Sequence, residues 1–394
     1  MIRTRSGLEI FCDRFPKELH GVRLGVLCHA PSIDSSYRHI ITCLKEIPEC
    51  TLGAIFGPQH GLFGQTQDNM VEWEGNIHPQ LKTPVYSLYG AVRKPTPAML
   101  DSIDALVIDL QDVGARPYTY IWTVKLCLEA CGERNIPVWV LDRPNPIGAL
   151  DFDGPLLSPD YFSFVGGAEI PLCHRMTIGE IALLLKQTYS PATELHVVWM
   201  ENWWRSSLWF QTGLPWVLPS PNMPTLDTAI VYPGMVLLEA TNLSEGRGTT
   251  RPFELIGAPY LRIDRLLASL SNKKVPGTVF REHNFIPTFQ KWKGDYCPGI
   301  QVHVTNVKEL NPVFLTATLL ASVIETAGEQ FAFKDPPYEY ETEKMPFDIL
   351  SGGDKLRKLL SVGAMEPKIR EEWKDEYKNF FVLFNDITHY PELL

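Results

Sequence analysis

The 394-residue sequence lacks any apolar run that approaches the roughly 18 consecutive residues of a membrane-spanning helix. It also lacks an excess of positive charge, because 36 Lys and Arg stand against 46 Asp and Glu and leave a net charge of -10. Such a chain has no broad field to attract nucleic acid or anionic lipid. We therefore expect neither nucleic acid nor membrane as a partner, and an anionic ligand must be bound by local Arg or Lys.

The N-terminus lacks the apolar block of a signal peptide, because Glu9, Asp13 and Arg14 interrupt the stretch MIRTRSGLEIFCDRF. The eight cysteines form no C-x-x-C pair and no dense module that would indicate disulfides. Cys127 and Cys131, four residues apart, are typical of a buried helix face. Reduced thiols fit this spacing, and we expect a cytoplasmic protein.

The N-terminal half alternates short apolar strands with helices. Runs typical of buried strands occupy residues 22–28, 52–56, 105–110, 137–141 and 194–200. Thr177 and Glu180 form a capping-box pattern at the start of one of the helices between them. This alternation predicts a mostly parallel sheet with both faces covered. We predict an α/β fold with a Rossmann-like domain over residues 1–225 and a smaller α+β domain over residues 226–394.

Cofactor motifs are missing from this sheet. The sequence has no G-x-G-x-x-G after the first strand, no G-x-x-x-x-G-K-[ST], no H-E-x-x-H and no G-x-S-x-G. His29, His60 and His174 lack the regular spacing of metal ligands. We therefore expect no metal and no cofactor. A nucleotide-dependent oxidoreductase is an alternative that only the predicted sheet favours, since a fold does not fix a chemistry.

Polar side chains are concentrated where the predicted strands end, which is where ligands bind in folds of this class. Three motifs supply them: FGPQHG, LQDVGARPYTY and LDRPNP. They contain Gln59, His60, Gln111, Asp112, Arg116, Tyr118, Asp142, Arg143 and Asn145. Each residue alone is more often a solvated or capping residue than a functional one, so it is their concentration at one sheet edge that predicts a polar binding site.

A second group of candidates lies in the C-terminal half. Residues 239–259, EATNLSEGRGTTRPFELIGAP, place Glu245, Arg247 and Arg251 between glycines. A disordered loop is one interpretation. The other is an ordered loop that lays one carboxylate and two guanidinium groups over the sheet edge, where Arg forks suit a ligand carboxylate or phosphate. We interpret the segment PPYEYETEKMP, residues 336–346, as a surface excursion.

The ordered set of motifs resembles a known family. FGPQHGLFG, PVYSLYG, LVIDLQDVGARPYTYI, LDRPNPIG, MTIGEIA, PSPNMPT, EATNLSEGRGTTRPFE and FDILSGGDKLR occur in an order similar to that of the exo-β-N-acetylmuramidases, the NamZ-like enzymes of glycoside hydrolase family 171. The resemblance implies an exo-acting glycosidase that releases N-acetylmuramic acid from the non-reducing end of peptidoglycan fragments during cell-wall turnover. It also implies an active-site cleft between the two domains, with no cofactor and no metal, and it leaves the oligomeric state open.

One residue departs from the family pattern. Gln59 stands where the resembled family commonly has the Glu of F-x-P-E-H-G, and an amide cannot exchange a proton as a general acid does. Asp112 or Glu245 is then the candidate acid/base, with His60 orienting or relaying. A sugar with a 2-acetamido group can supply its own nucleophile and needs only one acid and an orienting group.

The remaining candidates are predicted to bind substrate, and some arginine among them to meet the lactyl carboxylate of the sugar. They are Gln59, Gln111, Arg116, Tyr118, Asp142, Arg143, Asn145, Asn222, Arg247 and Arg251. Because of Gln59, two alternatives stay open beside the exo-muramidase. One is a non-catalytic binder of muramyl sugars, and the other is an exo-glycosidase of different specificity.

Overall fold

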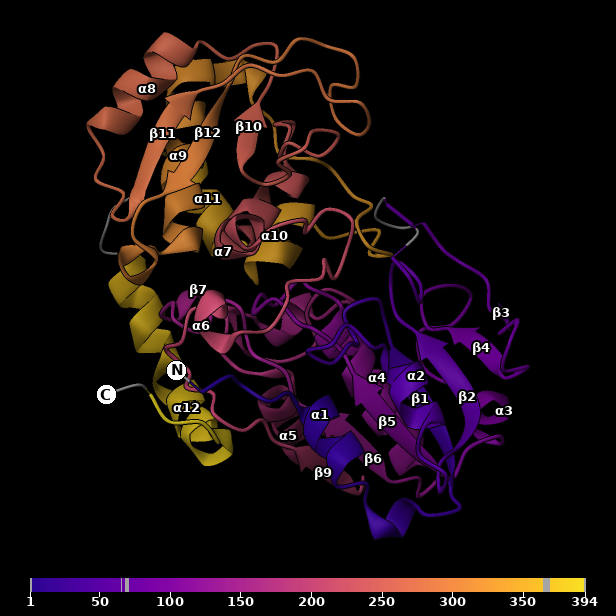
Figure 1. Ribbon diagram of the computed structural model, residues 1–394. Helices are drawn as coiled ribbons and strands as arrows, with labels where there is room; N and C mark the ends of the chain where they lie inside the picture. Colours follow the sequence, from indigo (N-terminus) through magenta and orange to yellow (C-terminus); the bar gives the residue numbers. More distant parts are fainter. Residues whose placement is uncertain (1, 65, 68–70, 364–368, 393–394) are drawn as a thin grey trace.

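The computed structural model of the chain describes residues 2–64, 66–67, 71–363 and 369–392. Its centre is a seven-stranded sheet in the order β3-β4-β2-β1-β5-β6-β9 (Figure 1). The strands are β1 (Arg23–Cys28), β2 (Thr51–Gly57), β3 (Asn76–Ile77), β4 (Pro84–Ser87), β5 (Ala105–Asp109), β6 (Val138–Leu141) and β9 (Leu195–Val198). All neighbouring pairs are parallel except β3 and β4, which confirms the Rossmann-like α/β expectation.

Both faces of the sheet are covered. In β5, Leu106 and Ile108 pack into one hydrophobic cluster, while Ala105 and Val107 pack into another, because successive strand residues point to opposite faces. The first cluster contains α4 (Tyr120–Gly132) and α5 (Ile178–Tyr189), and the second contains α1 (Gly7–Asp13) and α2 (Ile40–Lys45). The apolar strands of the sequence are therefore buried from both sides. The short helix α3 (Pro97–Leu100) precedes β5.

The strand order reverses beside β1. The chain adds β2 and β4 on one side of β1, and then β5, β6 and β9 on the other. Doubly wound sheets bind their ligands beyond the carboxyl ends of the strands at such a reversal.

The second lobe stands above this sheet edge (Figure 1). Its antiparallel sheet has the order β10-β12-β11, and α8 packs on both α9 and β11. Its elements are α7 (Leu226–Met235), η3 (Val236–Ala240), β10 (Leu255–Gly257), α8 (Ile263–Ser271), β11 (Thr278–Glu282), β12 (Gly299–Val304), α9 (Pro312–Ala327), α10 (Pro346–Ser351) and α11 (Lys355–Ser361). A smaller domain of mixed helices and strands is thus confirmed.

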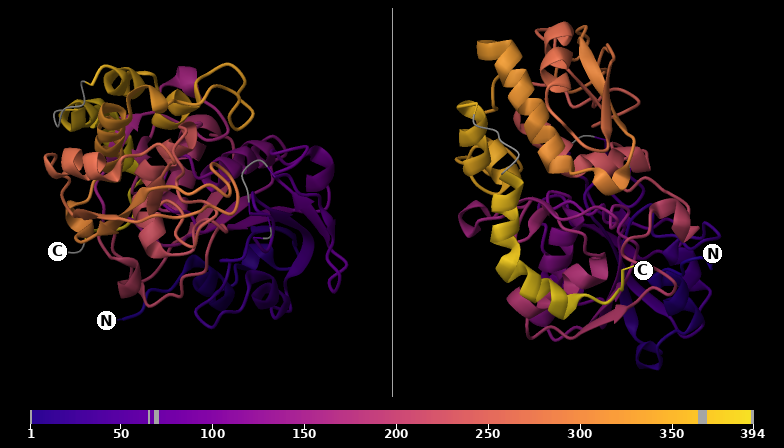
Figure 2. Two further views of the ribbon diagram at one scale, coloured as in Figure 1. Left: turned by 90° about the horizontal axis from the view of Figure 1, so that it is seen from above. Right: turned by 90° about the vertical axis from the view of Figure 1, so that its left-hand side faces the viewer.

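The chain then returns to the first lobe. The last helix, α12 (Ile369–Ile387), packs on α5 and on β7 (Asp153–Leu156), which pairs with β8 (Pro171–Cys173), and it runs down the side of the first lobe (Figure 2). The boundary between residues 225 and 226 stays a prediction. Within the described part of the chain, no helix combines the length and the apolar character needed to cross a bilayer.

Candidate functional site

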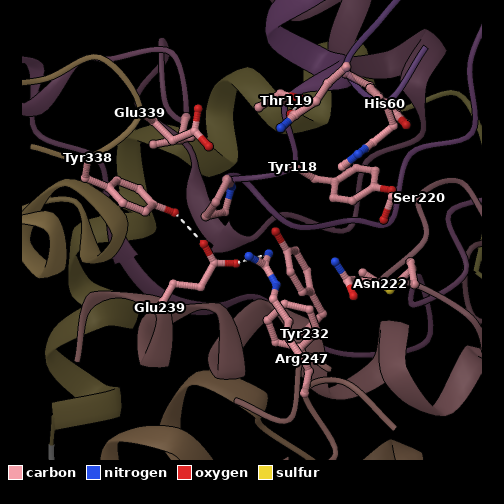
Figure 3. A pocket seen from close by; sticks show the side chains of 16 residues that line it. His60, Tyr118, Thr119, Ser220, Asn222, Tyr232, Glu239, Arg247, Tyr338 and Glu339 are labelled. Carbon is pink, nitrogen blue, oxygen red and sulfur yellow. Dashed lines mark hydrogen bonds and ion pairs between the residues drawn. The ribbon is translucent and has the colours of Figure 1, made fainter. Parts of the chain in front are cut away.

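A cavity lies at the strand-order reversal, between the two lobes. Figure 3 shows His60, Tyr118 and Thr119 on one side of it and Tyr338 and Glu339 on another, with Glu239 and Arg247 between them. The polar side chains of the lining are those of Gln59, His60, Tyr118, Thr119, Tyr120, Ser220, Asn222, Tyr232, Glu239, Arg247, Tyr338 and Glu339.

A constrained turn after β2 presents Gln59 and His60. Gly57 is required at its start, because a Cβ there would lie 2.6 Å from the Trp73 ring. His60 adopts a positive φ of 69°, and its Nδ1 donates to the carbonyl of Thr66 at 2.7 Å. The Oε1 atom of Gln59 accepts from Thr119 Oγ1 at 2.5 Å. The other end of this amide is a hydrogen-bond donor.

Tyrosines form the wall next to this turn. Tyr118, in the loop after β5, meets Tyr120 and Tyr232 edge to face, with ring centroids 4.8 and 5.7 Å apart. Burial raises the pKa of both Tyr118 and Tyr232 well above the ordinary value. These phenols therefore stay neutral and can donate hydrogen bonds to a sugar.

Glu239 and Arg247 form a buried ion pair in the cavity. Arg247 Nη2 lies 2.6 Å from Glu239 Oε1, and the Tyr338 hydroxyl donates to Glu239 Oε2 at 2.8 Å. Burial lowers the pKa of Arg247, but the carboxylates of Glu239 and Glu245 outweigh it and raise this pKa overall. The guanidinium is charged, and it is the arginine among the predicted four that reaches the cavity.

Glu245 lies behind Arg247 and does not line the cavity. Its Oε2 is 2.7 Å from Lys291 Nζ, and its Oε1 is 3.8 Å from Arg247 Nε. Burial raises the pKa of Glu245, but Lys291 and Arg247 together hold it below the ordinary value. Glu245 is therefore an ionised support for Arg247, and its position does not give it the access of a proton donor.

Glu339 is a buried carboxyl group in the same cavity, with 3% of its surface exposed. The Tyr89 hydroxyl donates to Glu339 Oε2 at 3.2 Å. Burial, helped by the negative charge of Glu239, raises the pKa of Glu339 to about 7. This carboxyl group can exchange a proton near neutral pH. The expectation that residues 336–346 form only a surface excursion is wrong at this position.

One predicted residue of the motif LQDVGARPYTY lines the cavity, and the others make structural contacts elsewhere. Asp112 Oδ2 accepts from the Gly114 backbone at 2.7 Å and lies 3.4 Å from His174 Nε2, away from the cavity. Gln111 donates to the carbonyls of Asp112 and Pro144. Arg116 is fully buried and donates to the carbonyls of Pro155, Ile170 and Leu350. Of the predicted residues in this motif, only Tyr118 lines the cavity.

The predicted residues of the motif LDRPNP make hydrogen bonds and an ion pair that stabilise the first lobe. Asp142 accepts from the Gly179 backbone at 2.8 Å and from the Tyr390 hydroxyl at 2.6 Å. Arg143 forms a buried ion pair with Asp109, and Asn145 donates to the Met176 carbonyl at 2.9 Å. None of the three predicted residues of this motif lines the cavity.

Of two further predicted residues, one lies outside the cavity and the other lines it. Arg251, whose side chain is 44% exposed, points to Glu254 outside the cavity. Asn222 lines the cavity and donates to the Gln67 carbonyl at 2.9 Å. Within the described ranges, no group of three or more His, Cys, Asp or Glu side chains is arranged to hold a metal ion.

Glu239, Tyr338 and Glu339 were not among the sequence candidates. Glu239 lies in η3, at the edge of the glycine-rich segment, and Glu339 is preceded by two prolines and one tyrosine in a stretch without a helix or strand period. The alternation of tyrosine with glutamate in PPYEYE is the signal that could have indicated a buried carboxyl group.

Two family models cover most of the chain. The N-terminal model of the exo-β-N-acetylmuramidase NamZ matches residues 24–227, and the C-terminal model of the same family matches residues 230–390. The peptidoglycan β-N-acetylmuramidase NamZ of Bacillus subtilis (strain 168) is 40% identical over 378 residues, which are 96% of this chain and 89% of that protein.

Solved structures share the whole architecture. A DUF1343 family protein from Bacteroides fragilis NCTC 9343 superposes with a TM-score of 0.86 at 32% identity, covering 99% of this chain and 100% of its own. A second DUF1343 family protein from the same organism superposes with a TM-score of 0.77 at 26% identity over the full length of both chains. Both lobes and their connection are therefore shared with these proteins.

Proposed function

The chain belongs to the exo-β-N-acetylmuramidase NamZ family, and on that premise we propose that it is a glycosidase that releases N-acetylmuramic acid from the non-reducing end of peptidoglycan fragments. The observation that carries the proposal is the cavity between the lobes, which a charged arginine and a protonatable carboxyl group both line. Tyrosines and side-chain amides surround them, as an uncharged sugar ring requires.

Arg247 is the proposed partner of the lactyl carboxylate. This group distinguishes N-acetylmuramic acid from N-acetylglucosamine, and a planar guanidinium matches a carboxylate in both charge and shape. Arg247 is held in place by Glu239 on one side and Glu245 on the other. Gln59, His60, Tyr118 and Asn222 are the proposed contacts to the rest of the sugar.

A panel of chromogenic glycosides tests the proposal. We expect release of the chromophore from the β-muramide at a kcat/KM far above that of the matching β-glucosaminide. A muramide that carries a further sugar on its 4-hydroxyl should not be cleaved, because the enzyme acts at the non-reducing end. Equal rates for the two monosaccharides, or cleavage of the blocked substrate, would contradict the assignment.

We also propose a cytoplasmic location, where peptidoglycan fragments are recycled. All eight cysteines are free thiols, and six of them are buried, which supports a reducing compartment. Cell fractionation, with the protein detected by an antibody, tests this, and recovery outside the cytoplasmic fraction would contradict it.

A further inference from the structure

The replacement of the family glutamate by Gln59 raises the question of which group gives the leaving sugar its proton. Breaking a bond to a sugar hydroxyl requires a general acid, because the alkoxide is a poor leaving group. Within the described residues, the carboxyl groups that line the cavity are those of Glu239 and Glu339. The choice is therefore between these two.

Both carboxylate oxygens of Glu239 are engaged by neighbouring side chains. One of its oxygens contacts the Arg247 guanidinium at 2.6 Å, and the other accepts from the Tyr338 hydroxyl at 2.8 Å. Protonating this carboxylate would break a buried ion pair, which is costly. Glu239 is thus suited to holding Arg247 and to placing a negative charge in the cavity, but not to giving up a proton.

Glu339 has the opposite surroundings. Its described hydrogen-bond partner is the neutral Tyr89 hydroxyl, and it forms no ion pair within the described chain. Four charged or titratable groups affect the pKa of Glu339. They are Glu239, Arg247, Arg93 and Tyr89, which follows β4. Burial and Glu239 both favour the protonated form, and together they raise the pKa of Glu339 to about 7.

We propose that Glu339, on the segment between the prolines at 336–337 and α10, is the catalytic general acid of this glycosidase, in place of the residue that Gln59 replaces. The inference rests on the proposed function and names the residue that performs its proton transfer. Gln59, which lines the cavity, keeps a binding role: its amide oxygen accepts from Thr119, and its amide nitrogen is a hydrogen-bond donor.

The reaction balances with one carboxyl group. Glu339 gives its proton to the glycosidic oxygen as the bond from that oxygen to C1 breaks, and the aglycone leaves as an alcohol. The carbonyl oxygen of the 2-acetamido group forms a bond to C1 in the same step. Water then adds to C1, the bond from the acetamido oxygen to C1 opens, and the Glu339 carboxylate takes a proton from that water. One water is consumed, and Glu339 is protonated again.

The test compares two leaving groups on the Glu339→Gln variant. The disaccharide of N-acetylmuramic acid and N-acetylglucosamine needs the acid, whereas a dinitrophenyl muramide does not, because its phenolate leaves unaided. We expect kcat/KM for the disaccharide to fall by about 10²- to 10⁴-fold and that for the aryl muramide to fall far less. The matched control is Glu343→Gln, at an exposed position of the same segment, which should leave both rates unchanged.

The wild-type pH profile gives a second readout that does not require the variant to fold. kcat/KM for the disaccharide should decline as pH rises through about 7, where Glu339 loses its proton, while the aryl muramide should show no such decline. The Glu239→Gln variant should shift this decline to lower pH, because it removes a negative charge that favours protonated Glu339.

The outcomes separate the two claims. Equal losses on both substrates in Glu339→Gln, no loss on either, or identical wild-type pH profiles for the two would overturn the role of Glu339. If the wild-type protein cleaves neither substrate, the proposed function fails, and the role of Glu339 fails with it.

Discussion

Charge pairing decides what each carboxyl group of the site can do. Glu239 and Glu245 both contact Arg247, and Glu245 also contacts Lys291, so each of these carboxylates has a cationic partner. Glu339 meets a neutral phenol instead. Residues of the same type within one region therefore have different chemistry, because burial without a cation favours the protonated acid.

Two arginines of one loop provide a matched test of substrate recognition. Arg247→Ala should raise the inhibition constant of free N-acetylmuramic acid about 10- to 100-fold, because a charged hydrogen bond is worth about 1.5–3 kcal/mol, while that of N-acetylglucosamine should change little. Arg251→Ala, at the partly exposed position outside the cavity, should alter neither constant. Competition against the chromogenic muramide measures both. A similar loss for the two sugars would exclude Arg247 as the lactyl partner.

Glu339 should also make stability depend on pH. A carboxyl group whose pKa is higher in the folded protein than in the unfolded chain stabilises the fold at low pH, and this contribution is lost as pH rises. For Glu339 the loss spans the range from about 4.5 through 7. The free energy of unfolding of Glu339→Gln relative to wild type should therefore increase between pH 5 and pH 8, by about 2–3 kcal/mol. Urea unfolding at the two pH values measures this, and a constant difference would show that Glu339 is not perturbed.

Part of the site could be predicted from the sequence because it follows the strands directly. Gln59, His60 and Tyr118 lie in the loops after β2 and β5, so their place at the sheet edge follows from topology alone. Asp112 lies in the same loop after β5, but its carboxylate accepts a hydrogen bond from the Gly114 backbone. Glu339 could not be found in this way, because its burial depends on contacts with Tyr89, about 250 residues earlier in the sequence.

Secondary-structure elements of this chain are fixed partly by local signals and partly by remote ones. Thr177 and Glu180 form the expected capping box at the start of α5. The helix α1 was not among the predicted elements, although Ser6 and Glu9 make the same kind of cap. The long helix α9 differs from both, since the side chain of its N-cap residue, Asn311, makes no capping hydrogen bond.

A residue of the first lobe caps α9. Asp153, in β7, accepts from the backbone N–H groups of Val313 and Phe314 at 2.7 and 3.1 Å. Its carboxylate thus satisfies donors that the first turn of any helix leaves unpaired. Such a contact could not be predicted from the sequence, because cap and helix are about 160 residues apart.

Asp153→Ala should lower the free energy of unfolding by about 2 kcal/mol, because two buried N–H groups lose their acceptor. Asp153→Asn keeps one acceptor oxygen and should lose less. Chemical denaturation at pH 7 compares the three proteins. An alanine variant as stable as wild type would show that this cap between the lobes contributes nothing to the free energy of unfolding.

The molecule as a whole is held together by contacts that cross between its lobes. The fully buried Arg116 donates to the carbonyls of Pro155 and Ile170 in the first lobe and of Leu350 in the second. The helix α12 follows the second lobe in the sequence but packs on α5 and β7 of the first. The two lobes, which both contribute walls to the cavity, therefore stabilise one another.

This mutual support predicts that the two lobes unfold together. Differential scanning calorimetry should show one transition whose calorimetric and van't Hoff enthalpies agree. Arg116→Lys should lower its midpoint, because an ammonium group cannot reach several carbonyls as a guanidinium fork does. Two resolved transitions in the wild-type protein would contradict the cooperative structure.

The most direct test of the glycosidase assignment is a time course on the unmodified disaccharide of N-acetylmuramic acid and N-acetylglucosamine. Mass spectrometry of the reaction should show the two free sugars forming in equal amounts, with multiple turnovers per protein molecule. Saturable binding of the disaccharide with no free N-acetylmuramic acid after prolonged incubation would contradict the assignment and identify the protein as a binder that does not cleave.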